Sequence, residues 1–145
     1  MIEETVKATG EVQIKLFNAD GSLKEEKTIK NLVVTVGKTW IAGRMVGTPT
    51  AMSHMAIGSG NTAAAAGDTA LGTSLGRVAL TSSTSSGAVA TFVASFGAGT
   101  GTGAVTEAGI FNDPSAGTML CRTVFSVVNK GASDGMTITW NITVS

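Results

Sequence analysis

The 145-residue sequence predicts a mostly β protein: an antiparallel, jelly-roll-like β-sandwich with an N-terminal hairpin and one short helix. Two observations lead to this prediction. Short runs that alternate polar and apolar residues recur along the chain, separated by clusters of Gly, Ser, Thr, Asn and Asp. Gly, Ala, Ser and Thr make up 72 of the 145 residues, whereas only 14% of the residues are charged. Short turns between strands favour a sandwich over an α/β fold.

The hairpin is the first patterned unit. Polar and apolar residues alternate over Glu11–Phe17, which places the three aliphatic residues of this segment on one face. Residues 18–21 then supply a turn that ends in Gly21. The returning segment, residues 23–29, is charged at its outward positions, as an exposed edge strand requires.

Charge is concentrated at the start of the chain, because residues 1–44 hold thirteen of the twenty charged side chains. We interpret the chain as an N-terminal arm, residues 1–9, followed by a single domain, residues 10–145. The expected parts of that domain are the hairpin unit with one further short strand (10–36), the short helix (37–46) and the main strands (54–144).

The helix is predicted because Trp40, Ile41, Arg44 and Met45 fall at helical spacing. Six strands are expected after it: His54–Gly58, Arg77–Ser83, Ala88–Phe96, Val105–Phe111, Met119–Val128 and Met136–Val144. In the last of these, five apolar residues ending in Val144 alternate with Thr and Asn. One face would therefore form a wall of the core, and the other would be polar without charge.

Few residues offer chemistry. The single imidazole, His54, begins an apolar strand, and no Gly-x-Ser-x-Gly motif is present. The single Cys121 lies in a strand-like run, as a buried, unreactive thiol would. The glycine-rich stretches 58–62 and 97–103 lack the Lys of a phosphate-binding loop, and we interpret them as flexible hairpin loops. We therefore expect a protein that is not an enzyme and has no cofactor and no metal site.

Glu107 lies inside an otherwise apolar strand, so its carboxylate needs a cationic or backbone partner to offset desolvation. Arg77 and Arg122 are the candidate cations. A structural ion pair that fixes strand register is the favoured role, with Glu107 and Arg122 as the hypothetical pair.

The composition also restricts the partners. A formal net charge of zero gives no electrostatic footprint for nucleic acid or for an anionic membrane surface. The first residues carry neither a basic nor an apolar leader segment, and no run approaches the ~20 apolar residues that span a bilayer. We therefore expect synthesis in the cytosol, without nucleic-acid or membrane partners.

The order of segments resembles small virion structural proteins of tailed bacteriophages, which are known as capsid decoration (cement), head-fibre or tail-collar and fibre proteins. The resemblance covers nearly all of residues 11–145 and rests on the order and spacing of several segments. These are Asn31–Gly37, a helix through Trp40 and Arg44, Met55–Thr62, Asp68–Leu71 leading to Arg77, Glu107–Asn112, Gly117–Phe125 and Thr137–Thr143.

The resemblance implies a β-sandwich or jelly-roll module that assembles as a homo-oligomer, often a trimer. A decoration protein would bind the major capsid protein on the capsid exterior and stabilise the shell. The N-terminal arm is the expected contact surface, through Ile2, Glu3, Glu4 and Lys7. Two alternatives stay open: a tail, collar or fibre component of the virion, and, more distantly, a carbohydrate-binding β-sandwich module.

Overall fold

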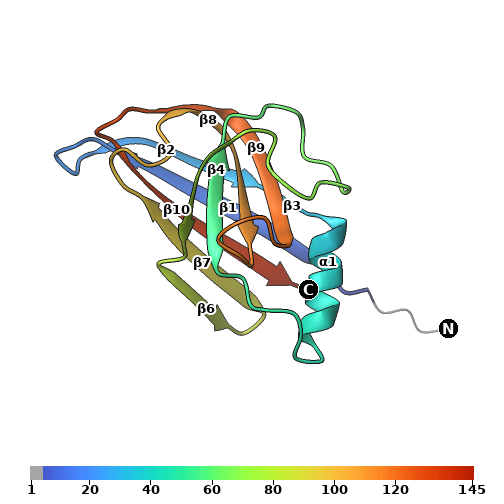
Figure 1. The fold of residues 1–145 in the computed structure, drawn as a ribbon. Helices are drawn as coiled ribbons and strands as arrows, with labels where there is room; N and C mark the ends of the chain where they lie inside the picture. The colour runs from blue at the N-terminus through green and yellow to red at the C-terminus, as the bar shows by residue number, and fades with distance from the viewer. Residues whose placement is uncertain (1–4) are drawn as a thin grey trace.

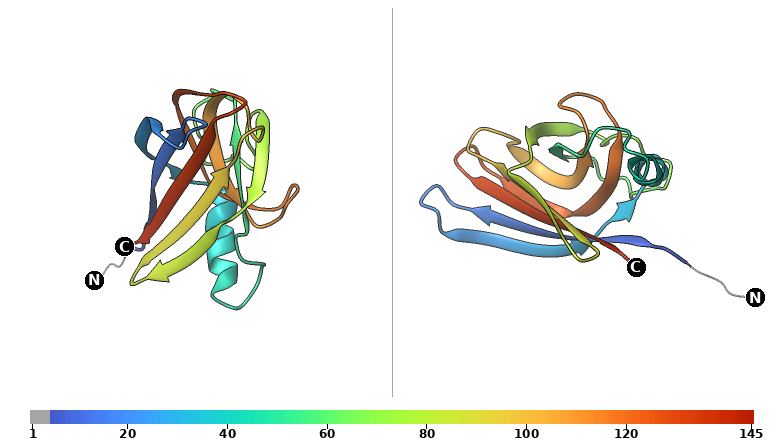
Figure 2. Two further views of the ribbon diagram at one scale, coloured as in Figure 1. Left: turned by 90° about the vertical axis from the view of Figure 1, so that its left-hand side faces the viewer. Right: turned by 90° about the horizontal axis from the view of Figure 1, so that it is seen from below.

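The computed structural model describes residues 5–145, which form ten strands and one helix in two stacked sheets (Figures 1 and 2). In chain order the elements are β1 (Ala8–Phe17), β2 (Leu23–Lys30), β3 (Leu32–Val33), α1 (Thr35–Arg44), β4 (His54–Gly58), β5 (Ser74–Ala79), β6 (Ser82–Ser86), β7 (Val89–Phe96), β8 (Gly103–Phe111), β9 (Met119–Lys130) and β10 (Gly135–Val144).

Each sheet has five strands, and every pairing is antiparallel. The first sheet has the order β2-β1-β10-β7-β6, and the second has the order β3-β9-β8-β4-β5. The first and last strands, β1 and β10, thus lie side by side within the first sheet and pair along their whole length. The predicted mostly β sandwich with one short helix is confirmed.

One core fills the space between the sheets. Apolar residues at every second position of β1 and β10 point into it, among them the fully buried Trp140. The alternation predicted for the last strand therefore holds as far as Ile142. Val144, the last residue of the strand, departs from it and is 45% exposed.

The hairpin unit divides between the two sheets. Its strands β1 and β2 pair in the first sheet, with charged β2 at the edge, as predicted. Its last strand, the further short strand predicted at the end of the unit, covers only Leu32–Val33 and pairs with β9 in the second sheet. The first strand begins at Ala8, inside the segment 1–9 that was interpreted as an arm.

Helix α1 begins at Thr35, two residues before the predicted start. Its N-cap residue is Val34, whose side chain makes no capping hydrogen bond, so the sequence shows no start signal at this position. Gly37 packs so closely on β9 that a Cβ there would collide with the Leu120 carbonyl oxygen. Trp40 and Ile41 face the core, whereas Met45, placed on the same face by its spacing, is 80% exposed at the helix end.

The single strand predicted at Arg77–Ser83 is wrong, because the chain changes sheets within it. Leu80 donates its backbone N–H to Ser53 on the second sheet, and Thr81 donates to Val93 on the first. Residues before this point belong to β5, and the exposed Ser/Thr run after it forms the edge strand β6. A strand held only by backbone pairing carries no apolar alternation, so the sequence did not indicate it.

Candidate functional site

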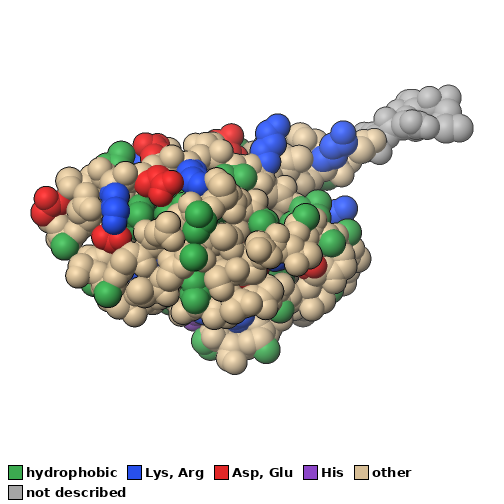
Figure 3. All heavy atoms as spheres, turned by 90° about the horizontal axis from the view of Figure 1, so that it is seen from above, with side chains coloured by type: hydrophobic (Ala, Val, Ile, Leu, Met, Phe, Trp, Pro, Cys, Tyr) green, Lys and Arg blue, Asp and Glu red, His purple; other side chains and the backbone are tan. Residues whose placement is uncertain are grey.

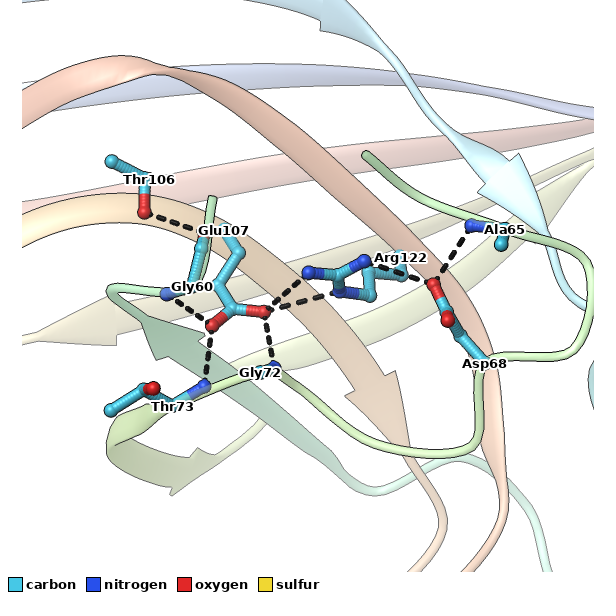
Figure 4. Close-up of polar contacts among 8 residues, drawn as sticks. All are labelled: Gly60, Ala65, Asp68, Gly72, Thr73, Thr106, Glu107 and Arg122. Atoms are coloured by element: carbon cyan, nitrogen blue, oxygen red, sulfur yellow. Dashed lines mark hydrogen bonds and ion pairs between the residues drawn. The ribbon is translucent and has the colours of Figure 1, made fainter. Parts of the chain in front are cut away.

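The most organised polar cluster surrounds Glu107, whose side chain is fully buried in β8. Strand pairing places Glu107 opposite Gly58 of β4 and Val124 of β9. The glycine-containing β4–β5 loop, residues 59–73, folds over the carboxylate from the side of the second sheet (Figure 4). The cluster thus joins the centre of this sheet to its covering loops.

Five N–H groups converge on the two carboxylate oxygens of Glu107 (Figure 4). Oε2 accepts from the backbone N–H of Gly60 at 2.6 Å and of Thr73 at 2.9 Å. Oε1 accepts from the backbone N–H of Gly72 at 2.8 Å, and from Arg122 through Nε at 3.1 Å and Nη2 at 3.0 Å. Because a carboxylate offers about four acceptor positions, its capacity is filled.

Arg122 of β9 is 3% exposed and extends the cluster toward the surface. Its Nη1 donates to Asp68 Oδ2 at 2.9 Å, and the same oxygen accepts from the backbone N–H of Ala65 at 2.9 Å. Asp68 itself is partly exposed. We call the three side chains Glu107, Arg122 and Asp68 the loop clamp, because each end of this chain of ion pairs binds a loop backbone.

Glycines let the loop backbone approach the carboxylate. A Cβ on Gly60 would collide with Glu107 Oε2, and one on Gly58 would lie 2.7 Å from the same atom. Any side chain at these positions would force the loop away from its hydrogen bonds. The interpretation of residues 58–62 as a flexible hairpin loop is therefore wrong, because a buried anion holds this segment in place.

The environment sets the protonation state of the clamp. Burial acts to raise the pKa of Glu107, but the N–H groups of Thr73, Gly72 and Gly60 and the Arg122 guanidinium outweigh it and hold that pKa below its ordinary value. The pKa of Asp68 is also lowered, first by the Ala65 N–H and then by Arg122, against opposing desolvation. The carboxylates of Glu107 and Asp68 are therefore ionised at neutral pH.

Arg77, the other cation considered for Glu107, lies elsewhere. The register of β5 with β4 sets it opposite Ala56, and its guanidinium stacks 3.7 Å above the centre of the Phe111 ring. It also donates to the carbonyl oxygens of Asp113, at 3.1 Å, and Ala116, at 2.8 Å. Arg77 thus fixes the 112–117 turn and takes no part in the loop clamp.

Of the predicted arm contacts, Ile2, Glu3 and Glu4 lie outside the described residues. Lys7 is exposed, and its backbone exchanges two hydrogen bonds with Ser145, at 2.6 and 2.8 Å. The structure thus places the root of the arm against the last residue of the chain. The role of the arm as a contact surface stays a prediction.

The isolated candidates occupy ordinary structural positions. His54 is half-buried, with Nδ1 2.7 Å from Ser53 Oγ. Cys121 is fully buried, which raises the pKa of its thiol far above the ordinary value. Within residues 5–145, no group of three or more His, Cys, Asp or Glu side chains is arranged to hold a metal ion. No helix in this part of the chain is long and apolar enough to cross a membrane.

The loop clamp positions loops rather than reacting groups, since every acceptor site on its buried carboxylate is occupied by the protein. Sequence reasoning missed Asp68 and the three backbone donors. The signal in the sequence is a set of three glycines around this loop. Gly58 and Gly60 lie where the loop begins, and Gly72 lies where the loop comes back to the Glu107 carboxylate. Comparisons of this chain with protein-family models, curated proteins and solved structures gave no match.

Proposed function

We propose that this protein is a non-enzymatic structural component of a tailed-bacteriophage particle, and specifically a capsid decoration protein. In this role it binds the major capsid protein on the outside of the assembled shell as a homo-oligomer, with a trimer as the expected form. One observation supports the proposal most: a neutral, hydrogen-bonded face on the first sheet, suited to burial against other protein subunits.

This neutral face consists of the outward residues of the paired strands β7 and β10: Thr91, Val93, Ser95, Thr137, Thr139, Asn141 and Thr143. Part of its polar groups already pair with one another. Thr91 Oγ1 donates to Asn141 Oδ1 at 2.7 Å, and the hydroxyls of Ser95 and Thr137 lie 3.4 Å apart. Because no charge must be desolvated, burying such a face costs less than burying one of Lys and Glu.

The neutral character extends beyond this face. Residues 78–106, which include β6 and β7, contain no charged side chain. In contrast, the opposite edge strand, β2, carries charges of both signs. The space-filling view shows charged side chains gathered along one rim, with much of the remaining visible surface uncharged (Figure 3). One edge is thus protected against pairing, and the other is available for contact.

Assembly into a homo-oligomer supplies the affinity for the capsid shell. A homo-oligomer that touches several capsid subunits makes each contact after the first intramolecular, so modest interfaces combine into tight binding. A protein that binds only the assembled shell stabilises the shell by mass action.

The carbohydrate-binding alternative receives less support from the aromatic residues. All seven lie in the described part of the chain, and none is exposed. Trp140 is fully buried, and half-buried Trp40 donates its indole N–H to the Thr50 carbonyl oxygen at 2.8 Å. A sugar-binding platform needs an aromatic ring that is open to the ligand.

Cosedimentation of the purified protein with assembled, undecorated capsids tests the proposal. We expect saturable binding that Thr139→Lys weakens at least tenfold, because the substitution brings a charge into the neutral face. Thr28→Lys, at an exposed position of β2, is the matched control and retains binding. Absence of binding by the wild-type protein overturns the decoration role, and equal binding by both variants overturns the neutral face as the contact.

A further inference from the structure

The edge strand β6 is the least protected strand of the two sheets. It contains only serine and threonine, and all five of its residues are exposed. Figure 1 shows it at an outer edge of the molecule. Within residues 5–145, its only hydrogen bonds are those of the backbone ladder with β7, and its hydroxyls have no partner. A free edge of this kind is a template for another strand.

The other three sheet edges are protected. β2 carries charges of both signs, and β3 is only two residues long. β5 carries Arg77 and is half-buried over four of its six residues. Charge, shortness and cover are common means by which edge strands avoid pairing with other chains, and β6 has none of them. Among the described strands, β6 is therefore the one open edge.

The hairpin geometry shows which backbone groups of β6 are free. A two-residue turn joins β6 to β7, so Ser86 and every second residue before it bond to β7. The N–H and C=O groups of Ser83 and Ser85 therefore point away from the sheet. Between them lies Thr84, whose side chain shares the neutral face with Thr91 of β7, its partner in the ladder. The open edge thus offers two donors and two acceptors on either side of a threonine.

We propose that β6 pairs with β6 of a second copy of this chain, antiparallel about a two-fold axis at Thr84. In that register, Ser83 of each copy lies opposite Ser85 of the other, so the outward N–H groups of both strands meet carbonyl partners. The two Thr84 side chains become cross-strand neighbours, a pair that their hydroxyls can stabilise. This inference rests on the proposed function and deepens it, because it assigns the contact through which copies of the protein associate.

The chemistry of β6 favours a second copy as its partner. A two-fold contact brings each residue close to the same residues of the other copy, so any charge near the axis would face its own kind. Residues 78–106, which include β6 and β7, contain no charged side chain. Serine and threonine hydroxyls both donate and accept, so two identical strands of them are complementary to each other.

The pairing also limits the assembly to two copies. It uses the open edge of each copy, and the far edge of the combined sheet is charged β2 on both sides. A dimer therefore takes the place of the trimer that was expected. The axis runs perpendicular to the sheet, so the two neutral faces lie on the same side of the dimer. Both can then contact one shell, which makes the second contact intramolecular.

Disulfide trapping at the two-fold axis tests the pairing. Thr84→Cys brings the thiols of two copies within disulfide distance, because the Cα atoms of such a pair lie about 4.5 Å apart. We expect a disulfide-linked dimer as the main product of mild oxidation, and the native Cys121 is buried and gives no background. Thr28→Cys, at an exposed position of the other edge strand, β2, is the matched control and yields little. Equal yields for the two variants overturn the proposal.

Charge placement tests the register. Ser83→Lys combined with Ser85→Lys sets like charges opposite each other across the axis, and we expect self-association to weaken at least tenfold in sedimentation equilibrium. Ser83→Lys combined with Ser85→Glu introduces as many charges but sets opposite signs across the axis, so association stays within about threefold of the wild type. Equal weakening in both variants overturns the register, and a monomeric or trimeric wild-type protein overturns the pairing itself.

Capsids take no part in these measurements, so the two proposals fail separately. If trapping at Thr84 fails while the protein still binds shells, the β6 contact is wrong and the decoration role stands. If trapping succeeds while shells are not bound, the β6 contact stands and the decoration role is wrong.

Discussion

Glu107 and Arg122 form an ion pair across β8 and β9, in which two guanidinium N–H groups donate to one carboxylate oxygen, Oε1, at 3.0 and 3.1 Å. The second oxygen is left to the loop amides of Gly60 and Thr73. This division explains how a charged pair is accommodated in the interior of the protein. The arginine neutralises the anion, and the anion orders the backbone of the β4–β5 loop.

Glu107→Gln is expected to lower the free energy of unfolding by about 3 kcal/mol or more, since it leaves Arg122 as a buried, uncompensated cation. The amide nitrogen of Gln also faces N–H donors, with which it cannot pair. Urea unfolding followed by tryptophan fluorescence measures the change. Glu11→Gln, at an exposed position of β1, is the control and should change stability by no more than ~0.5 kcal/mol.

Acidification should remove the contribution of the clamp. Because the folded-state pKa of Glu107 is lowered, its stabilisation is complete above the unfolded value of about 4.3 and is lost as the pH falls toward the folded value. The stability difference between the wild type and Glu107→Gln should therefore be constant from pH 7 to about 5.5 and shrink below about pH 4.3. A difference that stays constant down to pH 3 would show that the carboxylate charge does not stabilise the fold.

Gly60→Ala tests the close approach of the loop. The added Cβ collides with Glu107 Oε2, so we expect a loss of about 1–3 kcal/mol. Gly67→Ala is the matched control in the same loop region, because a Cβ there meets nothing within 4 Å. Equal stability of the two variants, measured by thermal unfolding, would be incompatible with the described hydrogen bonds of Gly60.

The sequence predicted the parts of the fold in which side chains alternate. Trp140 and its neighbours in β10 repeat with a period of two, and the Gly21 turn lies between alternating runs. It did not predict β6, whose serines and threonines are held by backbone pairing with β7. Met45 was also predicted wrongly, because it is exposed although its spacing places it on the core-facing side of the helix. Helical spacing shows which side of a helix is apolar, but not how far along the helix that side packs on the core.

One feature of the candidate site was predicted from the sequence, the acidic Glu107 within an apolar strand. A carboxylate in an apolar strand requires partners, and Arg122 is one of them. The other donors are backbone N–H groups of Gly60, Gly72 and Thr73, and every residue type except proline carries one. Which amides approach Glu107 depends on how the β4–β5 loop folds over the sheet, and sequence spacing does not encode it.

His54→Ala addresses the expectation that the protein is not an enzyme. His54 contacts Ser53 at the start of β4, so we expect the substitution to leave binding to capsids unchanged within twofold. A panel of ester, glycoside and peptide substrates gives the second readout. Hydrolysis by the wild-type protein that the alanine variant lacks would contradict the structural role.

The number of copies in purified phage particles tests the central claim most directly. Quantitative mass spectrometry of virions, with the major capsid protein as the internal standard, measures it without perturbing the protein. A decoration protein should be present in hundreds of copies for each particle, and a reconstruction should place it on the outer capsid surface. A few to a few dozen copies would contradict the decoration role and support a tail or collar component, and absence from the particle would contradict the virion role altogether.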